Sequence, residues 1–317
     1  MIPAQAHFIW FGSALPWVHA LAVRSAALRG DFERVILHHA DEPDGEGGWP
    51  GLKATARVEF RPLTPDEVLG RVERVGKPLA ELYGRLRAPA AKTNVLRVAI
   101  LAQEGGVYLD TDTVTIASFD HVRNAAAFCA TERIAFPAHA VWTRNPLRLL
   151  RSIRLHVQRE RLCRRPDGWR EFLRIEGQYE QAATNAILAS EPGHGFVVGL
   201  MERMLALPQW RQTVRYALGT HALQQHMAQY GGGDLVLHPP DVFCPLSPRI
   251  SAQWFVFRAE ASLDGVLSAR TRAVHWYASL HGREWASRLG PDHVRAHARD
   301  QLFSALAFPF INGNGHD

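Results

Sequence analysis

One stretch of the sequence decides the fold: Gly105-Gly106-Val107-Tyr108-Leu109-Asp110-Thr111-Asp112. The two glycines predict the end of a helix, because glycine accepts the left-handed backbone conformation that terminates helices. The apolar run 107–109 predicts a short buried strand. Asp110 and Asp112 follow it and, on an extended backbone, project to one face about 6.5–7 Å apart at Cα. Two carboxylates placed in this way can address one hard divalent cation.

The location of Asp110 and Asp112 at the end of a predicted strand is stronger evidence for a ligand site than their Asp-x-Asp spacing. A bare Asp-x-Asp pair is as typical of a surface turn as of a site. Carboxylates that end a buried strand, however, usually lie at the carboxyl edge of a sheet, where open α/β folds bind ligands. The sequence therefore predicts a ligand site at this edge.

Composition restricts the class of protein. The 317 residues are 47% hydrophobic and 21% charged, which is typical of a globular protein with a core. Three scattered cysteines and the lack of an apolar run of about 20 residues predict a cytoplasmic protein without a membrane span. The formal charge is +5, and only three of 36 basic residues are lysines. An arginine excess favours anionic ligands such as diphosphates, nucleic acid or anionic lipid.

The first part of the chain alternates between strand and helix patterns. Strands are predicted at 6–11, 34–39 and 58–60, and helices at 16–29, from 64, and at 89–104. Residues 114–116 and 126–130 are predicted to continue the sheet. This alternation predicts an α/β fold with a mainly parallel sheet flanked by helices.

The second half of the chain has a more helical sequence pattern. Residues 145–174 are strongly basic, and Leu147, Leu150, Arg154 and Val157 share a helix face. This segment is interpreted as a surface helical insertion or, alternatively, as an acceptor or membrane-surface patch. Helices are predicted at 181–189 and 199–207, and a rigid extended segment at 238–245. We expect a single domain composed of an α/β core (1–140), an Arg-rich helical insertion (141–235) and a C-terminal part that closes the site (236–317).

Several side chains outside the acidic pair are candidates for chemistry. Asn94 and Arg97 share a helix face that leads to the acidic strand, so Arg97 could hold a sugar hydroxyl or a phosphate, or pair structurally with a carboxylate. Trp10 ends the first predicted strand and could stack on a base or fill the core. His275 lies in an apolar run and is either a metal ligand or a buried structural histidine.

Two segments, 91–101 and 105–112, together resemble the glycosyltransferases with a sugar-binding DXD motif. That family includes fungal initiating α-mannosyltransferases, α-1,4-galactosyl- and N-acetylglucosaminyltransferases, and glucosylating bacterial toxins. Segments 2–12, 185–187, 192–194 and 273–276, with Trp285, also resemble parts of it. The resemblance implies a GT-A fold, a Rossmann-like sheet that holds a nucleotide-sugar together with Mn²⁺ or Mg²⁺.

The resemblance also implies roles for individual residues. Asp110 would contact the ribose and donor sugar, and Asp112 would bind the metal together with Asp110 and His275. Arg97 would hold the sugar or its phosphate. The remaining donor contacts would come from Ile9, Trp10, Asn94 and Tyr108. At Asn94 the chain departs from the family, which usually has Asp there, so one charge at the donor sugar is missing.

The activity implied is that of a retaining hexosyltransferase with a UDP-sugar rather than a GDP-sugar as donor. The acceptor would be a glycan, a lipid or a protein, and a peripheral contact with an anionic membrane is the alternative use of the basic helix. We expect no nucleic-acid partner and a bacterial, cytoplasmic protein. The residue pattern offers no defensible nucleophile, so a front-face mechanism assisted by the leaving group is our working hypothesis.

Two alternatives remain open at the level of sequence. Residues 109–114 fit the nucleophile signature of haloacid-dehalogenase-type phosphatases, although no lysine follows Lys92, and the spacing of Asp234 and Asp241 does not fit the acidic pair of those enzymes. The chain could also be a non-catalytic binder of nucleotide-sugars or anions, an interpretation that the uncharged Asn94 keeps open.

Overall fold

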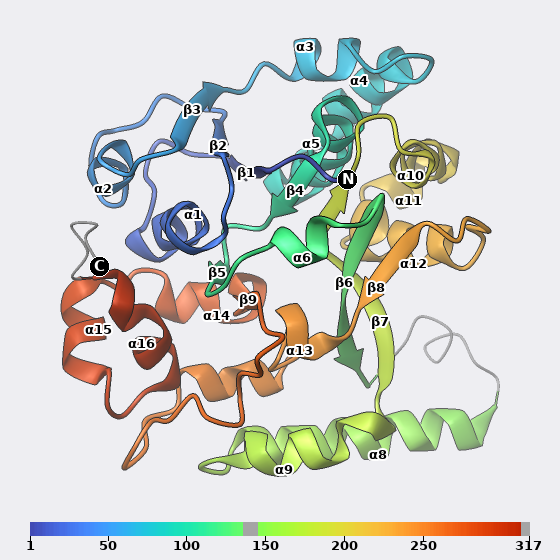
Figure 1. The fold of residues 1–317 in the computed structure, drawn as a ribbon. Coiled ribbons are helices and arrows are strands. Elements are labelled where there is room, and N and C mark those ends of the chain that lie inside the picture. The colour runs from blue at the N-terminus through green and yellow to red at the C-terminus, as the bar shows by residue number, and fades with distance from the viewer. Residues whose placement is uncertain (136–144, 312–317) are drawn as a thin grey trace.

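A seven-stranded sheet forms the centre of the protein in a computed structural model, which describes residues 1–135 and 145–311. Its strand order is β3-β2-β1-β4-β7-β6-β8 (Figure 1). The strands are β1 Gln5–Trp10, β2 Arg34–His39, β3 Val58–Pro62, β4 Gly106–Leu109, β6 Ala127–Ile134, β7 Glu180–Ser190 and β8 Leu235–His238. Strands β3, β2, β1 and β4 are parallel to one another, β6 is parallel to β8, and β7 runs antiparallel to both β4 and β6. The predicted α/β class with a mainly parallel sheet is confirmed.

The central stretch folds as its residues predict. Helix α5 (Pro89–Glu104) ends at Gly105, which has a φ of 64°, and Gly106 follows with a φ of 94°. A Cβ at Gly106 would lie 2.7 Å from the carbonyl oxygen of Gln5, so no larger residue fits there without displacement. Because β1 and β4 are parallel, with His7 opposite Tyr108, the ends of both strands meet at one edge of the sheet.

Helices cover both faces of the sheet, as alternating strand residues require. On one face, Phe8 and Val107 join a core cluster with helix α1 (Trp17–Arg29) and the short helix α13 (Pro240–Phe243). On the other, Tyr108 joins a cluster with α5, α10 (Gly195–Ala206) and α12 (Ala222–Met227). The smaller helices of this part are α2 Trp49–Lys53, α3 Pro65–Gly70, α4 Gly76–Arg85, α6 Asp120–Arg123 and α11 Gln209–Gln212.

A second, two-stranded sheet connects the acidic loop to the C-terminal part. Strand β5 (Thr113–Thr115) pairs antiparallel with β9 (Ala273–His275), and Thr113 lies opposite His275. The surrounding cluster is built largely from helices, which are α8 Pro146–Cys163, α9 Gly168–Ile175, α14 Ala278–Trp285, α15 Pro291–His297 and α16 Leu302–Ala307. This pairing brings residues more than 160 positions apart in the chain to one site.

The structure corrects three predictions of local structure. Residues 181–189, predicted as a helix, form most of β7, because pairing with both β4 and β6 overrides the helix propensity of an alanine-rich segment. Residues 114–116 do not continue the main sheet, since β5 pairs with β9 instead. The segment 238–245 is not extended throughout, because it contains α13.

Two further expectations concern organisation. Strand β7 interrupts the segment 141–235 that was predicted to be helical, although α8, α9 and α10 lie within it. The expected boundary at 140/141 lies outside the described residues. Among the residues that the structure describes, no helix combines the length and apolar character needed to cross a bilayer.

Candidate active site

A cavity of about 720 Å³ opens at the end of β4. It is lined by Asp110 and Asp112, by Asn94 and Arg97 of α5, and by His275 of β9. Strand pairing produces this convergence: β4 carries the acidic pair to the sheet edge, and β9 returns His275 opposite Thr113. The structure thus brings together five of the predicted site residues, with Tyr108 directly behind them.

Asp110 is fixed by groups that reach it from α5 and β4. Its Oδ1 lies 3.0 Å from a terminal nitrogen of Arg97 and accepts a hydrogen bond of 2.9 Å from the Tyr108 hydroxyl. Arg97 also donates to the carbonyl oxygen of Asn185 and stacks on the Tyr108 ring, with 4.3 Å between the guanidinium carbon and the ring centroid. Burial raises the pKa of Asp110, and the Arg97 guanidinium only partly opposes that rise. The carboxylate is therefore oriented before any ligand arrives.

Asp112 is held by the C-terminal part of the chain. Its Oδ1 lies 3.2 Å from Nε2 of His275, and its Oδ2 accepts a hydrogen bond of 2.6 Å from the backbone N–H of Ala278, at the start of α14. Burial alone would raise the pKa of Asp112, but His275 and the Ala278 N–H outweigh it and lower the pKa to about 2. In turn, the Asp112 carboxylate outweighs burial and holds the pKa of His275 well above its usual value.

The donor atoms of Asp110, Asp112 and His275 suit a divalent cation. One ligand atom from each lies within 4.8 Å of the others. Two carboxylates and an imidazole are ligands for Mn²⁺ or Mg²⁺, provided that the cation replaces the proton shared by Asp112 and His275. A second group, Glu132, Cys244 and His275, is equally compact. Burial raises the pKa of the Cys244 thiol, which disfavours the thiolate, so the two aspartates fit a hard cation better.

Asn94 is part of an uncharged network at the cavity wall. Its Oδ1 accepts a hydrogen bond of 2.7 Å from the side-chain amide of Asn185, and the Oδ1 of Asn185 accepts one of 3.1 Å from the Thr220 hydroxyl. A Cβ at Gly219 would lie 2.8 Å from the amide nitrogens of both asparagines, so the neighbouring segment can approach only without a side chain. This wall offers hydrogen bonds to a sugar but no charge.

Ile9 and Trp10 lie elsewhere along the same sheet edge. The Ile9 side chain is 5% exposed and packs in the core on the α5 side, which leaves only its backbone to contact a base. The Trp10 indole donates to the carbonyl of Ala14, and its ring lies 4.9 Å from that of His19. His19 in turn bonds the carbonyl of Thr111 between the two aspartates. Neither residue lines the 720 Å³ cavity, and a base contact by Trp10 stays a prediction.

Residues 67–129, which contain α5, β4 and both aspartates, match the family model described as "Glycosyltransferase sugar-binding region containing DXD motif". Over these residues the chain is similar to a glycosyltransferase sugar-binding region. The resemblance to that family, and with it the coarser prediction of a glycosyltransferase, is thereby confirmed. Curated proteins give no match to the chain.

Three of the solved structures similar to this one are glycosyltransferases. The PaToxG glycosyltransferase is 15% identical, with 72% of this chain and 69% of that chain covered and a TM-score of 0.42. The ligand-free glycosyltransferase domain from the YGT toxin is 12% identical, with 75% and 80% covered and a TM-score of 0.45. The galactosyltransferase LgtC, in complex with donor and acceptor sugar analogs, is 11% identical, with 92% and 99% covered and a TM-score of 0.39.

The sugar-binding region has neighbours that sequence reasoning missed. Glu132 of β6 lines the cavity, and its Oε2 accepts a hydrogen bond of 2.9 Å from the Tyr277 hydroxyl. Tyr277 has a left-handed backbone (φ 61°) just before Ala278, whose N–H binds Asp112. The only signal for Glu132 was a charge at the end of an apolar strand. Tyr277 gave none, because its backbone conformation follows from tertiary contacts.

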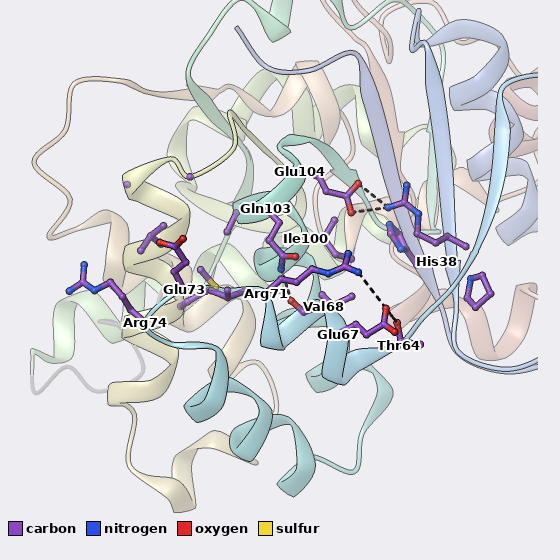
Figure 2. A pocket seen from close by; sticks show the side chains of 18 of the residues that line it. His38, Thr64, Glu67, Val68, Arg71, Glu73, Arg74, Ile100, Gln103 and Glu104 are labelled. Carbon is purple, nitrogen blue, oxygen red and sulfur yellow. Dashed lines mark hydrogen bonds and ion pairs between the residues drawn. The ribbon is translucent and has the colours of Figure 1, made fainter.

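A larger cavity of about 1140 Å³, whose lining includes neither Asp110 nor Asp112, lies between β2, α3, α5 and α10 (Figure 2). Its charges are largely paired with each other: Arg61 lies 2.7 Å from Glu104, and Arg71 lies 3.6 Å from Glu67. Among the described residues, both compact groups of metal-ligand side chains include His275, and neither borders this cavity.

Proposed function

We propose that this protein is a metal-dependent, retaining glycosyltransferase of the hexosyltransferase class, of GT-A type. It would transfer a sugar from a nucleotide-diphosphate sugar, UDP-linked rather than GDP-linked, to an acceptor. The observation that supports this is the placement of Asp110, Asp112 and His275 within 4.8 Å of one another on the wall of a 720 Å³ cavity, with both aspartates inside the matched residues 67–129.

We assign a different role to each residue around Asp110 and Asp112. A bound Mn²⁺ or Mg²⁺ would neutralise charge on the departing nucleoside diphosphate. Asp112, held as a carboxylate by the Ala278 N–H, and His275 would bind that cation. Asp110 would contact the cation and the donor sugar. Arg97 is 4% exposed and committed to Asp110 and Asn185, so it acts chiefly by orienting Asp110.

Retention of configuration follows from a front-face mechanism. The nucleoside diphosphate leaves and the acceptor enters from the same side of the sugar, so no enzyme nucleophile is needed. Glu132 is the one further carboxylate lining the cavity among the described residues, and its Oε2 is occupied by the Tyr277 hydroxyl. We expect Glu132→Gln to keep transfer and product configuration. Loss of transfer, with formation of a glycosyl azide when azide is added, would instead establish double displacement by Glu132.

The partners and location belong to the same proposal. The acceptor is a glycan, a lipid or a protein, and the cytoplasmic location is supported by Cys129, Cys163 and Cys244, which are all free thiols. Peripheral contact with an anionic membrane is included because exposed arginines cluster on α8. Phosphatase chemistry gains no support, since no lysine lines the cavity among the described residues and Asp110 is already engaged by Arg97 and Tyr108.

The test is a thermal-shift panel of UDP- and GDP-sugars with and without Mn²⁺, followed by mass spectrometry of transfer products. A donor at about 100 times its Kd should stabilise the protein by ~2.7 kcal/mol, and only with the cation. Asp110→Ala/Asp112→Ala should abolish that shift. The matched control, Asp66→Ala/Asp292→Ala, removes two exposed aspartates and should leave it intact. A cation-dependent shift that persists in the double variant would contradict the proposal.

A further inference from the structure

Helix α8 buries one face and exposes a second apolar face. Ser152, Leu155, Arg159 and Leu162 are its buried residues, and they recur every three or four positions, as expected for the side that packs on the protein. A solvated surface helix would carry polar residues on its other side. This one carries large apolar side chains there beside its arginines, which separates it from an ordinary surface insertion.

The outward face carries large apolar side chains in a row. Leu147 is 74% exposed, Leu150 63%, Ile153 44% and Val157 41%. At about 100° per residue, Leu150, Ile153 and Val157 point almost directly away from the buried set. The sequence could show that these residues share a face, but only the structure shows that the face is turned outward. Such a row is costly in water and indicates a partner.

Arginines flank this apolar row. Arg154 and Arg161 lie beside the row, and Arg148 is exposed on the first turn of the helix. None of the three forms an ion pair with residues 1–135 or 145–311. The one acidic residue of α8, Glu160, lies 3.8 Å from Arg249. A groove of about 640 Å³ runs along the helix, lined by Leu150, Ile153, Val157, Arg154 and Arg161, and also by Arg165, which is paired at 3.3 Å with Glu171 of the same groove. Apolar and cationic groups therefore border the same hollow.

We propose that this face of α8 docks on an anionic membrane surface, with the apolar row in the headgroup–acyl boundary and the arginines on lipid phosphates. An interfacial helix has this combination of an apolar stripe and flanking arginines, whose long stems reach back to the headgroups. A second copy fits less well, because a two-fold contact would place arginine against arginine. The inference deepens the proposed function, on which it rests for the choice of partner. It needs no residue of the 720 Å³ cavity lined by Asp110 and Asp112, which we call the DXD cavity.

Vesicle flotation provides the first measurement. The full chain should bind vesicles of phosphatidylcholine with phosphatidylglycerol at least about tenfold more tightly than vesicles of phosphatidylcholine alone, and added salt should weaken binding. Failure to bind the anionic vesicles, or equal binding to both kinds, overturns the proposal.

Two variants with matched controls locate the contact. Arg148→Gln/Arg154→Gln/Arg161→Gln should lose about a hundredfold in affinity, at about fivefold per arginine, and Leu150→Ser/Ile153→Ser should lose about tenfold or more. The controls remove the same number of arginines or of exposed apolar side chains elsewhere, through Arg29→Gln/Arg87→Gln/Arg299→Gln and Leu28→Ser/Val236→Ser. Equal losses in variants and controls would refute docking through α8.

Two further readouts separate the outcomes. The donor-induced thermal shift should be unchanged in both α8 variants, because α8 does not line the DXD cavity. If no donor binds but vesicle binding still depends on α8, the proposed function fails and the docking inference stands. A self-association that the α8 variants abolish, with vesicle binding retained, would assign the face to a second copy and overturn the inference.

Discussion

The cavity at Asp110 measures about 720 Å³, whereas the cavity between α3, α5 and α10 reaches about 1140 Å³. The larger one is rich in charge, yet Arg61 and Glu104 satisfy each other at 2.7 Å. In the smaller one, Asp110, Asp112 and His275 converge with like charges close together, an arrangement that gains stability when a cation binds. Functional sites are recognised by such convergence of buried titratable groups with shifted pKa values rather than by volume.

The sharpest test of this contrast replaces one carboxylate by its amide in each cavity. Asp112→Asn should lower kcat/KM for transfer by about a thousandfold, because several kcal/mol of charge neutralisation at the leaving group are lost. Glu104→Gln, which makes the same chemical change in the larger cavity, should leave transfer unchanged. The measurement is product formation with a UDP-sugar and Mn²⁺. Equal losses in the two variants would remove the distinction between the cavities.

Much of this site could be predicted because its residues are local in sequence. The order helix, Gly105-Gly106, strand and acidic pair depends on backbone preferences within about 25 residues, and α5 and β4 fold as expected. Arg97 and Asn94 follow from helix geometry. The position of Asp110 and Asp112 at the cavity could therefore be inferred from sequence, together with the sheet edge on which they lie.

The rest depends on pairing over long distances in the chain. Strand β7 was predicted as a helix because alanines favour helices locally, and only its two neighbouring strands reverse that preference. Glu132 reaches the cavity because β6 pairs with β7, and Tyr277 because β9 pairs with β5. The core position of Ile9 likewise depends on the covering helices. A hydrophobic pattern contains none of this information.

The next test concerns stability, through a histidine pair between the sheet and the larger cavity. Nδ1 of His7 lies 3.1 Å from Nε2 of His38, and His38 borders that cavity. Burial lowers the pKa of His7 to about 4 and that of His38 well below its usual value. Below pH 6.5 these two histidines bind protons in the unfolded chain, whereas in the native protein they stay neutral because burial lowers their pKa values. The free energy of unfolding should therefore fall by about 3 kcal/mol for His7 alone as the pH drops from 6.5 to 4.

Urea unfolding across this pH range measures the effect. His7→Gln/His38→Gln should flatten the dependence, even though the variant starts from a lower stability at neutral pH. Donor binding at pH 7 should be retained, since neither histidine lines the DXD cavity. An unchanged slope in the double variant would show that other groups cause the acid sensitivity.

A smaller effect on transfer should distinguish two arginines, one from each cavity. In the DXD cavity, Arg97 engages Asp110 and Asn185 and stacks on Tyr108, and a lysine cannot reproduce that geometry. Arg97→Lys should lower kcat/KM by about 30-fold, or ~2 kcal/mol. Arg61→Lys keeps a charge beside Glu104 in the larger cavity and should leave transfer unaltered. If the Arg97→Lys variant transfers sugar at the rate of the native chain, Arg97 does not act by orienting Asp110.

The smallest expected effect on transfer comes from introducing a charge at Asn94, in the uncharged wall of the DXD cavity. An aspartate at position 94 can still accept the amide hydrogen bond from Asn185, so Asn94→Asp should fold normally. A carboxylate would strengthen a hydrogen bond to a donor-sugar hydroxyl, which predicts about a tenfold gain in kcat/KM, near 1.4 kcal/mol. Asn124→Asp adds the same charge at an exposed site and should change nothing. If Asn94→Asp lowers transfer instead, the neutral Asn94–Asn185 pair is itself adapted to the donor of this enzyme, and the departure from the family pattern is a specificity feature.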